Sequence, residues 1–137
     1  MYSLAIFFAL CAFSYANIFN MSMDEINRAE YVLEGIDMAV DKLNSRHDRR
    51  ENQYRLVLDS ILKGNRHVTT GQLGNYYYIY VKMVETWCPN TDANDRKKVN
   101  ECLTKEGGSV KECKFELHTM PWSPDKSKKV RVTHIFC

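Results

Sequence analysis

The hydrophobic pattern changes its period once along this chain, and that change limits the folds open to it. From Ser22 to Leu43 apolar side chains recur every three or four residues, which is the period of an amphipathic helix. The apolar positions of this stripe are Ile26, Ala29, Leu33, Ile36, Val40 and Leu43. Ser22 followed by Glu25 fits a capping box that starts the helix. From Tyr54 onward the apolar residues alternate with polar ones, which predicts half-buried strands.

Strand-like alternation is found in several segments separated by polar or glycine-containing stretches. They run from Tyr54 to Leu62, Tyr76 to Trp87, Cys113 to Leu117 and Val130 to Phe136. We expect turns over Gly64 to Asn75 and Ser123 to Lys128, and hairpins would make the sheet antiparallel. The sequence predicts an α+β domain of two layers, with one N-terminal helix packed on a four- to five-stranded antiparallel sheet.

The N-terminal segment, Met1 to Ala16, has the pattern of a secretory signal peptide. Leu4 to Phe13 is an apolar run too short to span a bilayer, and Ser14-Tyr15-Ala16 places small residues at a cleavage point. In a chain of 137 residues this leaves a single domain over residues 17–137. We therefore expect a secreted, extracellular protein without a membrane span.

Four of the five cysteines lie after the signal peptide, at Cys88, Cys102, Cys113 and Cys137. An even number of cysteines in a secreted chain predicts disulfides, and three pairings are possible. Each closure would stabilise the fold by about 3 kcal/mol. A zinc site is disfavoured because no two of these cysteines have the short C-x-x-C spacing.

Asn20-Met21-Ser22 is an acceptor sequence for N-linked glycosylation. It lies just after the predicted cleavage point. We therefore expect a glycan on Asn20, near the start of the mature chain.

Charge and motif content argue against nucleic-acid binding and catalysis. The net charge of +2 is too small for a nucleic-acid partner. The chain has no glycine-rich phosphate loop and no His-Glu-x-x-His motif. Its histidines are scattered over predicted loops, turns and strands, and oxidised cysteines leave no thiol nucleophile. We expect no enzyme, no cofactor and no metal.

The order of one helix followed by strands, together with the cysteines in the C-terminal half, resembles the secreted two-disulfide cystatins. These are inhibitors of papain-like cysteine proteases. The resemblance covers nearly the whole mature chain. Its most specific match is Pro121-Trp122, shortly after Cys113, which is similar to the family's second hairpin. The resemblance also implies sequential disulfides, Cys88–Cys102 and Cys113–Cys137.

In that family the inhibitor is a wedge with three contact points, which fills the groove of the protease without presenting a scissile peptide. The contacts are an N-terminal trunk with a glycine, a first hairpin with Gln-x-Val-x-Gly, and the Pro-Trp hairpin. The resemblance implies a monomer that binds cathepsin L- or B-type proteases. The implied contact residues of the two hairpins are His67, Val68, Thr69, Thr70 and Gly71, and Pro121 and Trp122.

The chain departs from the family pattern at two of the three contacts. In the first hairpin, His67 replaces Gln and Thr69 replaces the central residue of the motif. A second register, from Thr70 to Gly74, keeps the family's Gly-x-x-Tyr spacing and makes Gly74 a further candidate. The trunk has no glycine, so its apolar candidates are Ile18 and Phe19, close to the sequon.

These departures leave a second interpretation open. The chain can be a secreted binding or effector protein on a cystatin fold that has lost protease inhibition. The tyrosine run Tyr76, Tyr77, Tyr78 and Tyr80 would then be a candidate partner surface, since tyrosine is favoured at interfaces. Alternate tyrosines also suit an ordinary solvent-facing strand.

Overall fold

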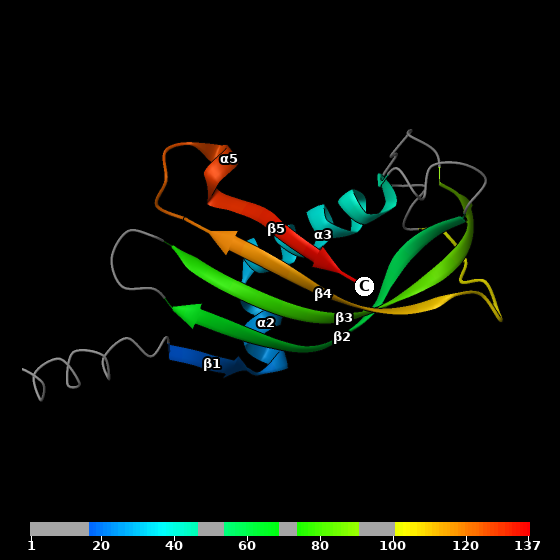
Figure 1. Ribbon diagram of the computed structural model, residues 1–137, viewed down its shortest axis with the longest axis horizontal. Helices are drawn as coiled ribbons and strands as arrows, with labels where there is room; N and C mark the ends of the chain where they lie inside the picture. Colours follow the sequence, from blue (N-terminus) through cyan, green and yellow to red (C-terminus); the bar gives the residue numbers. More distant parts are fainter. Residues whose placement is uncertain (1–16, 47–53, 69–73, 91–100) are drawn as a thin grey trace, which may run out of the picture.

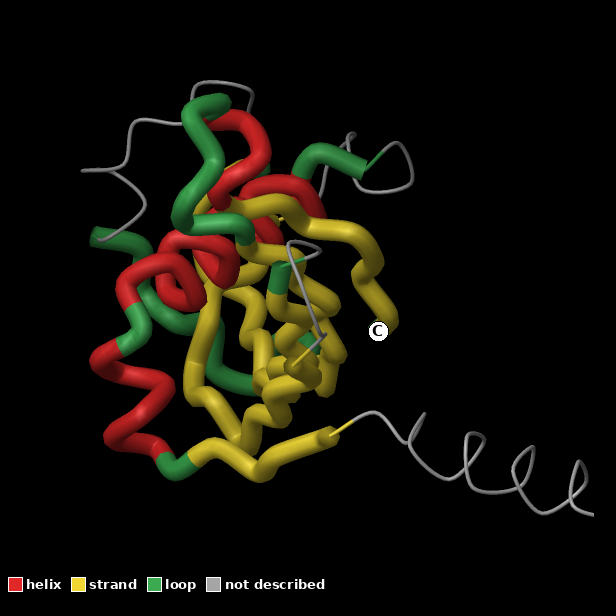
Figure 2. The backbone as a smooth tube through the Cα atoms, turned by 90° about the vertical axis from the view of Figure 1, so that its left-hand side faces the viewer, coloured by secondary structure: helices red, strands yellow, loops and turns green. Residues whose placement is uncertain are grey.

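The computed structural model describes residues 17–46, 54–68, 74–90 and 101–137. The predicted signal peptide, Met1 to Ala16, lies outside the described residues. The elements in chain order are β1 (Asn17–Met21), α2 (Met23–Arg28), α3 (Glu30–Asn44), β2 (Tyr54–Val68), β3 (Asn75–Pro89), β4 (Val110–Thr119), α5 (Lys126–Lys129) and β5 (Val130–Phe136). The strands form one five-stranded antiparallel sheet in the order β1-β2-β3-β4-β5. Helices α2 and α3 cover one face of it, which confirms the predicted two-layer architecture (Figures 1 and 2).

The fifth strand is the N-terminal segment, which shows no clear alternation in the sequence. β1 pairs with the far half of β2, from Asn17 opposite Val68 to Met21 opposite Gly64. The sheet therefore has an additional edge strand before the helix, and the chain turns from β1 into α2 at Ser22.

The single helix predicted from Ser22 to Leu43 is divided in two at Ala29. Its start is as expected, since the Glu25 N–H donates to Ser22 Oγ at 3.2 Å. Ala29 has φ −83° and ψ 87°, which are not helical values. Alanine is the residue best suited to helices, so no local preference causes the break. The cause is tertiary: α2 packs Ile26 against the sheet at Gly64 and Ile79, and α3 continues over β4 and β5.

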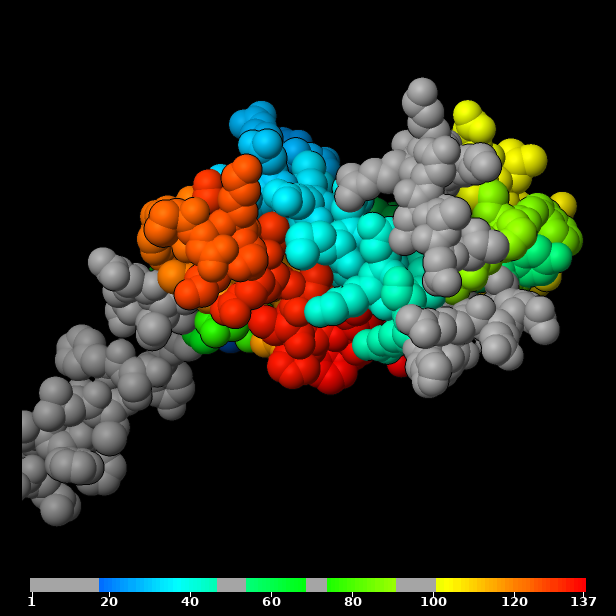
Figure 3. Space-filling model, turned by 90° about the horizontal axis from the view of Figure 1, so that it is seen from above, coloured from blue at the N-terminus to red at the C-terminus, as the bar shows by residue number. Residues whose placement is uncertain are grey.

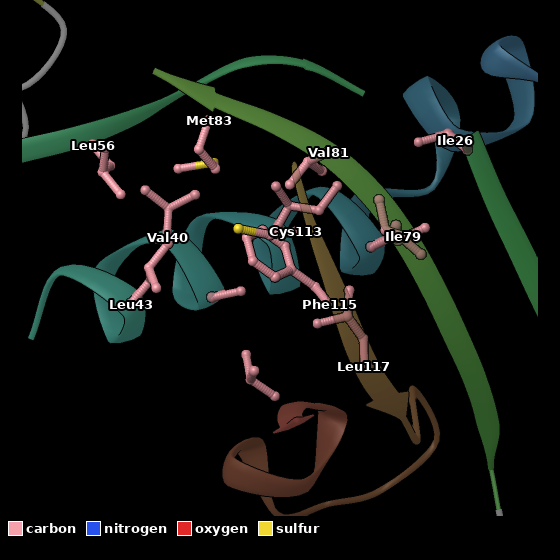
Figure 4. Close-up of a cluster of buried hydrophobic side chains, with 14 residues drawn as sticks. Ile26, Val40, Leu43, Leu56, Ile79, Val81, Met83, Cys113, Phe115 and Leu117 are labelled. Atoms are coloured by element: carbon pink, nitrogen blue, oxygen red, sulfur yellow. The ribbon is translucent and has the colours of Figure 1, made fainter. Parts of the chain in front are cut away.

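The core lies between the two helices and the sheet (Figure 4). Four positions of the predicted stripe are buried, namely Ile26, Ile36, Val40 and Leu43. Leu33 and Ala29 only border the core, whereas Val32 and Ala39 are inside it, because the break rotates the buried face. The sheet contributes Leu56, Ile79, Val81, Met83, Phe115 and Leu117. Full burial of one such side chain contributes about 1.5–3 kcal/mol.

A buried amide joins the end of α3 to β2. The Asn44 Nδ2 group donates to the carbonyl of Leu56 at 2.8 Å, and the Leu56 N–H donates to Asn44 Oδ1 at 2.9 Å. Asn44 is the last residue of α3 and is 3% exposed, so its polar side chain depends on these hydrogen bonds. They fix the distance between the helical layer and the sheet at this end.

The strand alternation predicted for β2 is interrupted by bulges. The pairing with β3 shifts register between Leu58 and Ser60 and again between Ile61 and Lys63. The sequence places Leu58 and Ile61 on opposite faces, yet both pack against the core. Each extra residue in a bulge reverses the alternation of the residues that follow it.

Gly64 is not part of a turn, contrary to the sequence-based expectation, because β2 continues to Val68. Gly64 is buried and paired on both sides, with Met21 of β1 and Ile79 of β3. A Cβ on it would lie 2.9 Å from Ile26 Cδ1 and 3.0 Å from Ile79 Cδ1. The glycine therefore allows α2 to approach the sheet closely.

The two disulfides join Cys88 to Cys102 and Cys113 to Cys137. This is the sequential pairing that the resemblance implies, and it is confirmed. The first disulfide ties the end of β3 to the segment before β4. The second ties β4 to the residue that follows β5.

We expect Gly64→Ala to lower the free energy of unfolding by about 1–3 kcal/mol, because the added methyl group overpacks a filled core. Urea denaturation with the disulfides intact measures this loss. Ile26→Val removes the Cδ1 atom nearest to the new methyl group. The double variant should therefore lose less than the sum of the two single losses. Strictly additive losses would show that Gly64 does not serve this contact.

Candidate functional site

One end of the sheet is formed by five residues paired side by side across all five strands. Asn17 lies opposite Val68 and Val68 opposite Asn75. Asn75 lies opposite Thr119, and Thr119 opposite Val130. We call this set the end row. At this end β1, β3 and β5 begin and β2 and β4 end, so the β4–β5 connection lies beside the ends of the other strands (Figure 1).

The β4–β5 connection carries Pro121 and Trp122 in a tight turn. The Ser123 N–H donates to the Met120 carbonyl at 3.0 Å, so Pro121 occupies the second position of the turn, where its fixed φ is favoured. The Met120 N–H donates to the Lys129 carbonyl at 2.9 Å and closes the connection at its base. The Trp122 side chain is 53% exposed. The structure thus presents a large aromatic side chain on a short, hydrogen-bonded turn.

The second half of this connection is helical, where the sequence predicts only a turn. α5 begins after Asp125, whose Oδ1 accepts hydrogen bonds from the Ser127 N–H at 3.0 Å and the Ser127 hydroxyl at 2.7 Å. These hydrogen bonds to Ser127, with a smaller contribution from the charge of Lys128, lower the pKa of the Asp125 carboxyl group. Aspartate is a favoured N-cap residue, so Asp125 is the sequence signal for this helical turn, and the expectation of a turn alone did not use it. In Figure 3 this connection, in orange, projects at one end of the molecule.

The candidate residues of the first hairpin lie at the end of β2. His67 and Val68 are the last two residues of the strand, and Val68 belongs to the end row. The His67 ring lies 6.3 Å from that of its cross-strand neighbour Tyr76. Thr69, Thr70 and Gly71 lie outside the described residues.

Gly74 packs the first hairpin against the second. It has φ +87°, which confirms the turn geometry expected for it, and it is buried. A Cβ on Gly74 would lie 2.4 Å from the Thr119 carbonyl oxygen, 2.7 Å from His118 Nε2 and 2.8 Å from Met120 Cγ. Only glycine combines this backbone conformation with so close an approach. Gly74 therefore positions the two hairpins relative to each other.

Behind the end row, three polar side chains form a second link between the hairpins. The ring of Tyr76 lies 4.6 Å from that of His118, and the Arg131 guanidinium lies 3.1 Å from His118 Nδ1. The three residues are cross-strand neighbours on β3, β4 and β5. Sequence reasoning did not identify His118 or Arg131 as part of the site. Strand alternation in the sequence can place both residues on one face of the sheet, but only the register of β4 and β5 shows that they are neighbours.

The candidate trunk residues are held in the edge strand. Ile18 and Phe19 belong to β1, where they pair with His67 and Arg66. Both are substantially exposed, Ile18 at 62% and Phe19 at 47%. The Arg66 guanidinium lies 5.6 Å from the centre of the Phe19 ring. Both residues lie next to the end row, as part of the edge strand and not of a free N-terminal extension.

The opposite end of the sheet carries a second exposed tryptophan. Trp87, on β3, is 53% exposed and packs edge-to-face against Tyr54 with ring centres 5.6 Å apart. Lys105 Nζ lies 4.7 Å from the ring centre of Tyr54 and 4.9 Å from that of Trp87. Leu103, which accepts a hydrogen bond from the Trp87 N–H, is 75% exposed. We call Tyr54, Trp87, Leu103 and Lys105 the far patch.

Two other kinds of site were sought in the described part of the chain. Within those residues no group of three or more His, Cys, Asp or Glu side chains could hold a metal ion. None of the helices described there is long and apolar enough to cross a membrane.

Replacement of glycine by alanine should distinguish Gly74 from Gly107, whose φ is +72° and around whose added Cβ no described atom lies within 4 Å. Gly107→Ala incurs only the left-handed backbone strain, about 1–2 kcal/mol. Gly74→Ala adds the clash with Thr119 and should cost about 1–3 kcal/mol more. Urea denaturation of both variants tests this difference. Equal losses would contradict the role of Gly74 in packing the hairpins.

No protein-family model matches this chain, and no curated protein matches it significantly in sequence. Its fold is nevertheless similar to solved structures. The crystal structure of dimeric human cystatin F superimposes with a TM-score of 0.63 and 15% identity, over 89% of this chain and 86% of that one. The salivary cystatin of the soft tick Ornithodoros moubata gives 0.61 and 12%, over 89% and 96%.

A third solved structure, Al-CPI, has a TM-score of 0.59 and 11% identity, over 88% of this chain and 97% of that one. At such low sequence identity these superpositions establish the fold alone and leave the activity open. The two disulfides, the helical layer and the five-stranded antiparallel sheet agree with this fold. The chain therefore has the cystatin fold, in a form with two disulfides.

Proposed function

We propose that this protein is a secreted, reversible inhibitor of papain-like cysteine proteases of the cathepsin L or B type. The observation that carries the proposal is the end row. It brings the start of β1 and the two hairpins to the same end of one sheet. A wedge that enters a protease groove needs this arrangement.

Trp122 is the main anchor of the proposed complex. A tryptophan offers a large contact area and loses little side-chain entropy on binding. Its turn is fixed by the Ser123 and Met120 hydrogen bonds, so little ordering free energy is needed on binding. Pro121 stiffens the same turn. No scissile peptide is placed at the catalytic thiol, and the protein acts as an inhibitor and not as an enzyme.

The first hairpin supplies the second contact. Val68 stands in the end row beside Asn75, and His67 precedes it on β2 with its side chain on the other face. Together with Thr69, Thr70 and Gly71, these two residues form the proposed second edge of the wedge. Gly74, which is buried, acts by holding this hairpin against β4.

The N-terminal contact is the smallest of the three. Cleavage of the signal peptide after Ala16 would make Asn17 the first residue of the mature chain, level with the end row. Little chain would then extend beyond the sheet to act as a trunk. Ile18 and Phe19 contribute from the edge of β1, where both side chains are exposed.

The protein is proposed to act as a monomer in an oxidising compartment. At the β5 edge of the sheet, Lys42 Nζ donates to the Val132 carbonyl at 3.4 Å and Arg46 donates to the Ile135 carbonyl at 2.8 Å. Charged side chains bonded to edge carbonyls oppose strand-to-strand association at β5. Two disulfides are typical of secreted proteins.

The far patch favours a second candidate function, in which the chain is a binding or effector protein on a cystatin fold. Its exposed tryptophan and leucine form an apolar surface at the end of the sheet opposite to the hairpins. Aromatic residues of this kind are enriched at interfaces. This candidate does not require inhibition of a protease.

Titration of papain and a cathepsin L-type protease with the secreted, disulfide-intact protein tests the inhibitor proposal. We expect inhibition at sub-micromolar concentration and a loss of at least about 30-fold in affinity with Trp122→Ala, as for an interface hot spot. Ile18→Ala should weaken inhibition less than Trp122→Ala does.

Trp87→Ala is the matched control, because Trp87 and Trp122 are both 53% exposed but lie at opposite ends of the sheet. It should leave inhibition unchanged. Absence of inhibition at about 10 μM, an affinity weaker than about −7 kcal/mol, would overturn the proposal and favour the second candidate.

A further inference from the structure

The sheet has an open face that carries aromatic and titratable side chains. The helices cover only the other face (Figure 2). Tyr76, Tyr78 and Tyr80 alternate along β3 and point to the open face, since the intervening Tyr77 and Ile79 pack on the core. This face is separate from the far patch and borders the end row at His67 and Tyr76.

A groove of about 450 Å³ crosses the open face. The residues that line it are His67, Tyr76, Tyr78, Glu116, Thr133 and His134. Glu116 lies between Tyr78 and His134 in this lining: it pairs with Tyr78 across β3 and β4, and its carboxylate contacts His134 Nδ1. Burial, and then the neighbouring Glu116 charge, raise the pKa of Tyr78, so its hydroxyl keeps its proton.

Asn20, the residue of the glycosylation sequon, lies in line with this groove. It pairs with Asn65 of β2, which pairs with Tyr78, and Tyr78 pairs with Glu116. The Asn20 side chain is exposed and is on the same face as Tyr78. Two strand spacings, about 10 Å, separate Asn20 from Tyr78. The first sugars of an N-linked glycan can span that distance.

We propose that Asn20 carries an N-linked glycan whose first sugars pack into the groove. The covalent step is the ordinary one of the secretory pathway, with a lipid-linked oligosaccharide as co-reactant. The Asn20 amide nitrogen forms a bond to C1 of the first sugar and loses one proton. The bond from C1 to the lipid pyrophosphate breaks, and the lipid pyrophosphate leaves with the electron pair.

The chemistry of the groove suits a saccharide. The ring faces of Tyr76 and Tyr78 can stack against the C–H face of a pyranose. Glu116, Thr133 and His134 offer acceptors and donors to its hydroxyl groups. A sugar attached at Asn20 is also present at a high effective concentration, so weak contacts are enough to seat it.

The proposal also gives the glycan a position relative to the end row. Asn20 lies three residues along β1 from Asn17, about 10 Å from the end row. A glycan seated in the groove extends across the open face as far as His67 and Tyr76, beside the end row. It would share His67 with the proposed wedge, whereas Val68, Pro121 and Trp122 do not line the groove, and neither inference depends on the other.

Tyrosine nitration mapped by mass spectrometry tests the proposal on the full chain secreted from eukaryotic cells. The glycosylated protein is compared with Asn20→Gln. We expect nitration of Tyr76 and Tyr78 to slow at least about threefold in the glycosylated protein, which corresponds to a groove filled two-thirds of the time. Tyr31, on α3, should react equally in both proteins.

A matched control moves the glycan to the helical layer. Asn20→Gln combined with Ala29→Ser places a sequon at Asn27, which is exposed on α2. Serine also suits the helix-capping position that Ala29 occupies. This glycoform should not protect Tyr78.

Three results would overturn the proposal. The first is an intact mass without a glycan on Asn20. The second is equal nitration of Tyr78 with and without that glycan. The third is equal slowing of nitration at Tyr78 and Tyr80, since Tyr80 lies outside the groove and a glycan that does not bind in the groove would shield both tyrosines.

Discussion

The antiparallel register of the five strands is the constraint on which the rest of this structure depends. It aligns Asn17, Val68, Asn75, Thr119 and Val130 at one end, and so brings three separate chain segments together. A slip by one residue would exchange the buried and exposed faces of a strand. The register is held by the core face of β3 and β4, and the Cys113–Cys137 disulfide ties β4 to the chain end after β5.

Two glycines allow close packing on this sheet, each for a different physical reason. Gly64 lies inside a strand, where the absence of a side chain lets Ile26 reach the sheet. Gly74 combines a positive φ with contact to Thr119, and so joins the two hairpins. The Tyr76, His118 and Arg131 side chains add a polar link behind the end row. The hairpins are thus positioned by packing as well as by their own turns.

The sequence predicted what depends on local periodicity and missed what depends on contacts between distant segments. Hydrophobic spacing was enough for the two layers, and the resemblance supplied the disulfide pairing. The break at Ala29 and the strand position of Gly64 both arise from the packing of Ile26, which has no local signal. Pro121-Trp122 was recognisable as a motif, whereas the pairing of His118 with Arg131 follows only from strand register.

Amide hydrogen exchange in a mixture with a papain-like protease, inactivated by replacement of its catalytic cysteine, tests the role of the end row most directly. The account predicts slower exchange in peptides that cover residues 17–21, 67–75 and 119–130, with the rest of the chain unchanged. Protection confined to the far patch around Trp87 and Leu103, or no protection at all, would contradict it.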